Sequence, residues 1–125
     1  FKNDLKKKSV TLPVSAPFHC TLMKKAEEEM KKYLANVVVN KPSIPIISNF
    51  VASAQNDPTK IKELLIKQIC GRVRWRESIL YMNKQGINKI VEIGPSKTLT
   101  NMMKRFKLDL KTINIESIDD IKNYD

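Results

Sequence analysis

The sequence predicts an α/β fold, in which a mostly parallel sheet carries helices on both of its faces. Short β-prone runs alternate with amphipathic helical patterns along most of the chain. A chain of 125 residues with 42% hydrophobic content is also long enough to form one domain with a core. Alternation of strands and helices favours parallel pairing, because a crossover helix returns the chain to the end of the sheet where it started.

The N-terminal part is expected to form a strand, a helix and a second strand. Residues 11–14 are β-prone, and Pro13 and Pro17 then exclude helix from the segment that follows. Over residues 21–34 apolar side chains recur every three or four positions, which predicts a helix of about four turns. The short apolar run 44–50 suits a buried strand better than a helix.

Two helices are predicted next. Asp57 and Pro58 form a helix start signal, with aspartate as the N-cap and proline at the first helical position. Gly71 provides a stop for this helix. A second helical pattern begins at Trp75 and closes at Gly86.

The C-terminal part is expected to add a strand, a helix, a strand and a short helix. Residues 88–93 are a strand candidate that ends in a Gly-Pro-Ser turn, and helical spacing over 99–106 follows directly. Residues 112–115 predict a further strand, after which Ser117 caps a terminal helix.

The charge of the chain allows acidic partners without indicating nucleic acid. Lysine and arginine outnumber aspartate and glutamate by 23 to 13, which gives a formal net charge of +10 and attracts acidic or phosphorylated partners. The lysines are spread along the whole chain, and no ribonucleoprotein motif, zinc-ligand spacing or basic region followed by heptads is present. We therefore expect no nucleic-acid partner and no metal.

Other features point to a cytoplasmic protein without a membrane partner. No apolar run approaches the roughly 18 residues that a membrane-spanning helix needs, and the lysine-rich start does not lead into a signal sequence. Cys20 and Cys70 are far apart in sequence, which favours reduced thiols over a disulfide framework. Because the chain opens at Phe1 without a methionine, we expect it to be part of something larger.

Two strand-to-helix junctions, at 13–20 and 93–97, have the location where ligands bind in open α/β sheets, beside exposed helix N-termini. The first of them carries His19, the only histidine in the chain. An imidazole can take up and return a proton near neutral pH. A single histidine is nevertheless more often structural or exposed than catalytic. A role for His19 therefore has to be argued from the residues around it.

Three stretches together resemble one enzyme family. Leu12–Met23, which contains Ala16-Pro17-Phe18-His19-Cys20, resembles the histidine motif of malonyl-CoA:acyl carrier protein transacylases. Gln68–Trp75 resembles the region that follows this motif, and Val91–Leu99 resembles the late strand-to-helix turn of the same enzymes. The likeness extends from about Leu12 to Phe106 with matching spacings, and the histidine motif is its most specific part.

The resemblance implies a bacterial-type fatty acid synthesis enzyme that moves a malonyl group from coenzyme A to acyl carrier protein through a serine acyl-enzyme. Its partners would be malonyl-CoA, acyl carrier protein and the N-terminal part of the same enzyme, and no cofactor is implied. The family's large subdomain is α/β-hydrolase-like, with a ferredoxin-like subdomain inserted before the histidine motif. Residues 1–11 would then be the exit from the inserted subdomain, and residues 12–125 the C-terminal part of the large one.

The resemblance also implies three site residues. His19 would be the general base that deprotonates the serine hydroxyl and later the incoming thiol. The backbone carbonyl of Gln68 would orient the imidazole in place of a carboxylate. Phe18 would leave little room for an α-methyl branch and would favour malonyl over methylmalonyl groups. A plain core aromatic is the alternative for Phe18.

The chain departs from the family pattern in what it lacks. The sequence contains no Gly-x-Ser-x-Gly nucleophile elbow, so the chain alone should be inactive. Solvated or ion-paired side chains are expected for the arginines that do not match the family's carboxylate-binding position, which are Arg72, Arg74, Arg76 and Arg105. Two other interpretations stay open: an acyltransferase domain of a larger polyketide or fatty acid synthase, and a small basic binding module without catalysis.

Overall fold

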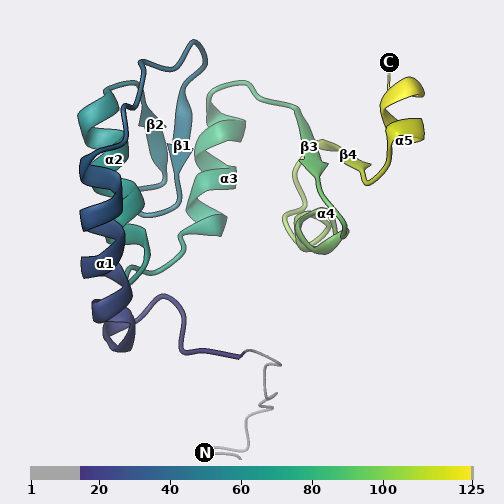
Figure 1. Cartoon of the computed structure of the whole chain (residues 1–125). Helices are drawn as coiled ribbons and strands as arrows, with labels where there is room; N and C mark the ends of the chain where they lie inside the picture. Colours follow the sequence, from purple (N-terminus) through teal and green to yellow (C-terminus); the bar gives the residue numbers. More distant parts are fainter. Residues whose placement is uncertain (1–14, 125) are drawn as a thin grey trace, which may run out of the picture. The chain divides into compact units, whose positions relative to one another are not determined.

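The computed structural model describes residues 15–124, which form two compact units (Figure 1). The first unit extends to Val73 and the second begins at Arg74. The strand expected at 11–14 and the subdomain exit expected at 1–11 lie outside the described residues. Within the described part of the chain, no helix combines the length and the apolar character needed to cross a membrane.

The first unit pairs two helices with a short hairpin. It contains, in chain order, η1 (Thr21–Met23), α1 (Lys24–Ala35), β1 (Ile46–Ser48), β2 (Ser53–Gln55) and α2 (Pro58–Gln68). Helix α1 packs against α2, and α2 packs against β1 (Figure 1). The helix predicted over 21–34 is confirmed, and it begins as a 3-10 turn before α1.

A short hairpin forms where the sequence predicts a single strand. β1 pairs antiparallel with β2, from Ile46 opposite Gln55 to Ser48 opposite Ser53. A turn over 49–52 reverses the chain, and the amide of Ala52 donates a 2.7 Å hydrogen bond to the carbonyl of Ser48. The single strand expected at 44–50 is therefore only partly confirmed, and the second strand has no apolar run that could have revealed it.

Helix α2 begins as its local sequence predicts. The Asp57 carboxylate accepts a 2.6 Å hydrogen bond from the amide of Lys60, and Pro58 occupies the first turn. The buried side of the helix carries Ile61 and Leu64, which are 5% and 3% exposed. These side chains belong to the few buried hydrophobic residues of the first unit, so α2 is its central packing element.

The second unit is built around a parallel strand pair. It contains α3 (Trp75–Lys84), β3 (Lys89–Ile93), α4 (Thr98–Met103), β4 (Lys111–Ile115) and α5 (Ile118–Lys122). β3 pairs in parallel with β4, from Lys89 opposite Lys111 to Ile93 opposite Ile115, and α4 forms the connection between them. This strand–helix–strand unit confirms the order predicted for the C-terminal part, although α4 ends at Met103, earlier than its apolar spacing suggested.

Local signals also set the ends of α3 and α5. Gly86 has φ of +85°, a left-handed conformation that glycine adopts without steric cost, and its amide bonds to the Asn83 carbonyl at the end of α3. At α5, Ser117 and Asp120 form a reciprocal capping box.

The mostly parallel sheet with helices on both faces is not confirmed. The described residues form two separate two-stranded sheets, one antiparallel and one parallel. The structure differs from the prediction at residues 44–55, where the turn over 49–52 lets the chain pair with itself before α2 begins. An alternating pattern of helices and strands does not report a hairpin this short.

Candidate active site

His19 lies in a tight turn between Pro17 and the first helical turn. Its backbone has φ of +61°, a left-handed conformation that is uncommon outside glycine. It costs about 1–3 kcal/mol and persists only where the surrounding structure enforces it. Two hydrogen bonds stabilise the chain on either side: the amide of Phe18 donates to the carbonyl of Ala16 at 2.9 Å, and the thiol of Cys20 donates to the carbonyl of Pro17 at 3.1 Å. Residues with such strained backbones are frequent at functional sites, which makes His19 a candidate functional residue.

The imidazole of His19 is held by the main chain of a distant helix. Its Nδ1 lies 3.0 Å from the carbonyl oxygen of Gln68, 49 residues further along the chain. A carbonyl oxygen can only accept a hydrogen bond, so Nδ1 must carry the proton in this contact. In the neutral ring the lone pair is then on Nε2, the nitrogen that remains available for proton transfer.

The Gln68 carbonyl is available because it lies at the end of α2. The last four carbonyls of an α-helix have no partner within the helix. Two neighbours of Gln68 find partners just beyond the helix: the amide of Ile69 bonds to the Ile66 carbonyl at 3.2 Å, and the amide of Gly71 bonds to the Lys67 carbonyl at 3.0 Å. The carbonyl of Gln68 accepts from the imidazole instead.

Both cysteines lie close to this contact in sequence, one beside His19 and one beyond Gln68. Burial raises the pKa of the Cys70 thiol, and its hydrogen bond to Glu27 raises it further. The carboxylate of Glu27 is itself held by Lys24, and the hydrogen bonds from Lys24 and Cys70 lower its pKa. Cys70 therefore stays a neutral thiol at neutral pH and is a poor candidate for a nucleophile.

Phe18 precedes the histidine in the same turn, and 54% of its surface is exposed. The ring is therefore not a core aromatic within the described structure. Its role toward an acyl group stays a prediction.

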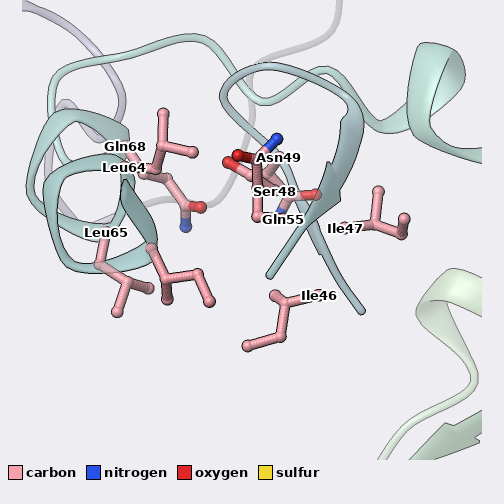
Figure 2. A pocket seen from close by; sticks show the side chains of 9 residues that line it. Ile46, Ile47, Ser48, Asn49, Gln55, Leu64, Leu65 and Gln68 are labelled. Carbon is pink, nitrogen blue, oxygen red and sulfur yellow. The ribbon is translucent and has the colours of Figure 1, made fainter. Parts of the chain in front are cut away.

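A small hollow lies between α2 and the hairpin, and Gln68 is one of the residues that line it. It has a volume of about 150 Å³. Figure 2 shows the side chain of Gln68 extending from α2 toward the hairpin residues Ser48, Asn49 and Gln55. Gln68 thus contributes its main chain to His19 and its side chain to the hollow. Sequence reasoning missed this feature, because it depends on a hairpin that has no clear sequence signal.

The second junction expected to bind a ligand, at 93–97, is already satisfied internally. The carboxylate of Glu92 accepts hydrogen bonds from the amide of Leu99 at 3.0 Å and from the amide of Thr100 at 2.7 Å. The Thr100 side chain and these amides lower the pKa of Glu92, which favours the charged form. The first turn of α4 therefore binds a carboxylate of its own chain. The signal in the sequence was a glutamate near the end of the strand, a few residues before the helix.

Other candidate groups have structural partners. Arg74 pairs with Glu77 across one helical turn at 3.5 Å, as expected for an arginine outside the substrate site. Ser96 follows Gly94 with the spacing of a nucleophile elbow, but Thr98 stands where the second glycine would be, and the Ser96 hydroxyl lies 3.3 Å from the Thr98 hydroxyl. Among residues 15–124, no cluster of histidine, cysteine, aspartate and glutamate could hold a metal ion.

Comparison with known proteins gives these residues a context. No family model matches the chain. The malonyl CoA-acyl carrier protein transacylase of Haemophilus influenzae is 35% identical over 112 residues, which cover 90% of this chain and 36% of that protein. This chain thus spans only about a third of the length of this relative.

Solved structures agree with the sequence comparison. The acyl-carrier-protein S-malonyltransferase of Bartonella henselae superposes with a TM-score of 0.86 at 40% identity, over 94% of this chain and 37% of that one. A malonyl-transacylase solved in complex with a type II polyketide-synthase acyl-carrier protein superposes with a TM-score of 0.86 at 28% identity, over 94% of this chain and 38% of that one. By sequence and by fold, the chain is therefore a homologue of the C-terminal portion of malonyl CoA-acyl carrier protein transacylases.

Proposed function

We propose that the complete protein transfers a malonyl group from coenzyme A to acyl carrier protein, and that His19 is its general base. The observation that carries this proposal is the 3.0 Å contact between His19 Nδ1 and the Gln68 carbonyl. It fixes the tautomer in which Nε2 can accept a proton. The backbone of His19 is also held in an uncommon conformation. The similarity to malonyl transacylases supplies the reaction.

In this mechanism His19 accepts and returns a proton once in each half-reaction. In the first half-reaction Nε2 takes the proton of a serine hydroxyl as its oxygen attacks the malonyl thioester, and the imidazolium then returns the proton to the departing thiolate of coenzyme A. In the second half-reaction Nε2 takes the proton of the carrier protein's thiol, which attacks the acyl-serine, and the serine oxygen recovers the proton. The serine belongs to the part of the enzyme outside this chain.

A carbonyl can replace the carboxylate of a classical triad because of its position. The imidazolium that forms in each half-reaction lies at the C-terminal end of α2, an 11-residue helix. The helix end carries no full negative charge, and the Gln68 carbonyl orients the ring by accepting its Nδ1 hydrogen bond.

Phe18 is proposed to select the acyl group. It lies next to the base in the chain, and its exposed ring is free to line the acyl pocket of the complete enzyme. A ring at this place leaves no room for the methyl branch of methylmalonyl, and excluding one methyl group is worth roughly 1–3 kcal/mol.

We also propose how the chain fits into the whole enzyme. Residues 12–125 would form the C-terminal part of an α/β-hydrolase-like large subdomain, and residues 1–11 the exit from an inserted ferredoxin-like subdomain. Large apolar side chains of the first unit that are exposed support a covering partner: Leu22, Tyr33, Val38 and Ile44. The reducing cytoplasm is the proposed location, where Cys20 and Cys70 would stay free thiols.

Substitution of the histidine in the complete enzyme tests the proposal. We expect His19→Ala to lower kcat/KM for malonyl transfer by about 10²–10⁴-fold, with an unchanged melting temperature. His19→Gln keeps a polar side chain in the turn without a base and should lose as much activity. Near wild-type transfer by either variant would exclude His19 as the general base.

A further inference from the structure

The ring of Phe50 occupies the space beside Gly71 in which a side chain would otherwise lie. A Cβ atom built on Gly71 would stand 2.3 Å from Cδ2 and 2.3 Å from Cε2 of Phe50, and 2.9 Å from the carbonyl oxygen of Lys67. Such contacts are far shorter than the 3.5–4.0 Å that carbon atoms prefer. Residue 71 can therefore be only glycine while the ring and the end of α2 keep their places.

Lack of room for a side chain, and not the backbone conformation, explains why residue 71 is glycine. Gly86 and Gly94 have φ of +85° and +150°, conformations that disfavour other residues, whereas Gly71 has no such positive φ. The backbone at position 71 could thus be adopted by alanine. What excludes alanine is the aromatic ring on one side and the last turn of α2 on the other.

The ring is carried by a turn that is itself fixed. Phe50 lies in the 49–52 reversal between β1 and β2, where its amide bonds to the hydroxyl of Ser48 at 3.3 Å. The Ala52 amide closes the same turn on the Ser48 carbonyl at 2.7 Å, and Ala52 is 7% exposed. Phe50 is therefore presented to Gly71 from a well-anchored hairpin.

The contact acts on the peptide that holds His19. The amide of Gly71 donates a hydrogen bond to the carbonyl of Lys67. The next residue after Lys67 is Gln68, whose carbonyl accepts the hydrogen bond from the imidazole. We infer that Phe50 and Gly71 form a positioning pair: their contact fixes the end of α2 so that the Gln68 carbonyl can orient the imidazole of His19. Both residues are proposed to act through the Gln68 carbonyl, as positioning residues. This inference rests on the proposed role of His19 as general base.

The test uses the complete enzyme with Gly71→Ala. The added methyl must displace the ring or the helix end. We expect the helix end to give way, which moves the Gln68 carbonyl away from Nδ1. Misplacing a catalytic group by about 1 Å can cost up to roughly 100-fold in rate, so we expect kcat to fall about 10–100-fold while KM for malonyl-CoA stays within about twofold. The nitrogen NMR signals of His19, assigned with His19→Gln, should show loss of the fixed Nδ1–H tautomer.

A second substitution separates positioning from general damage. In Gly71→Ala with Phe50→Ala the ring is gone, although the Lys67 carbonyl oxygen still lies 2.9 Å from the position of the methyl, so part of kcat and of the Nδ1–H signal should return. Gly86→Ala is the matched control: it introduces strain at a positive φ in open space, and should lower the melting temperature without changing kcat.

The outcomes distinguish this inference from the proposed function. If His19→Ala is inactive but Gly71→Ala keeps full kcat and the fixed tautomer, the positioning pair is refuted and the general base stands. If Gly86→Ala, against expectation, lowers kcat as much as Gly71→Ala does at an equal loss of melting temperature, the positioning pair is refuted as well. If His19→Ala itself retains activity, the proposed function fails, whatever the NMR signals of Gly71→Ala show.

Discussion

The imidazole of His19 donates to the main-chain carbonyl of Gln68 across 3.0 Å. Because the acceptor belongs to the backbone, we expect Gln68→Ala in the complete enzyme to retain kcat within about threefold. Steady-state kinetics of malonyl transfer measures this. The variant also enlarges the hollow in Figure 2, because it shortens a side chain that lines it. A small loss of melting temperature therefore agrees with the main-chain role of Gln68. A hundredfold loss of kcat would instead show that the Gln68 side chain takes part.

Phe18 should govern the choice of acyl group. Replacing its ring by the small side chain of serine opens space for a methyl branch, so Phe18→Ser should reduce the preference for malonyl-CoA over methylmalonyl-CoA by about 10–200-fold. The ratio of kcat/KM for the two thioesters is the measurement. Phe18→Tyr keeps the ring and serves as the control that should retain the preference. Equal use of both thioesters by the unchanged enzyme would contradict the proposal.

Asp57 should stabilise α2 through its N-cap. Its carboxylate accepts the 2.6 Å hydrogen bond from the Lys60 amide, and loss of such a cap costs about 0.5–2 kcal/mol. We expect Asp57→Ala to lower the free energy of unfolding by this amount, and Asp57→Ser to restore most of it. Denaturant unfolding of the complete enzyme followed by circular dichroism compares the three proteins. Equal stability of Asp57→Ala and wild type would show that this cap contributes nothing.

Glu92 should make stability depend on pH at acid values. Its pKa is lowered in the folded state by the side chain and amide of Thr100 and by the amide of Leu99. The stabilisation is therefore complete above the unfolded pKa of about 4.3, and is lost as the pH falls through the lower folded value.

The variant Glu92→Gln isolates this effect. It removes the charge and keeps an oxygen acceptor, so its melting temperature should lie below that of the wild type at pH 7 and approach it below pH 4. Melting curves between pH 3 and pH 7 provide the comparison. A constant difference at all pH values would mean that the Glu92 charge does not contribute.

The sequence by itself determined where α2 and α5 begin and where α3 ends. Asp57, Gly86 and Ser117 begin or end helices because their effects act on atoms only a few residues away. The strand–helix–strand order of residues 89–115 could be predicted for the same reason. The spacing of apolar residues along a short segment indicates whether that segment is a strand or a helix. The family resemblance pointed to His19 through the histidine motif and to Gln68 through the stretch that follows it, although it could not give the distance between them.

Only the tertiary structure decided which distant groups meet. The contact between His19 and Gln68 joins residues 49 positions apart, and it depends on how the turn before α1 meets the end of α2. The ring of Phe50 meets Gly71 because a hairpin forms where the sequence indicated one strand. Such contacts depend on packing between elements, which local periodicity does not encode, because the same amphipathic helix can bury its apolar side against many different neighbours.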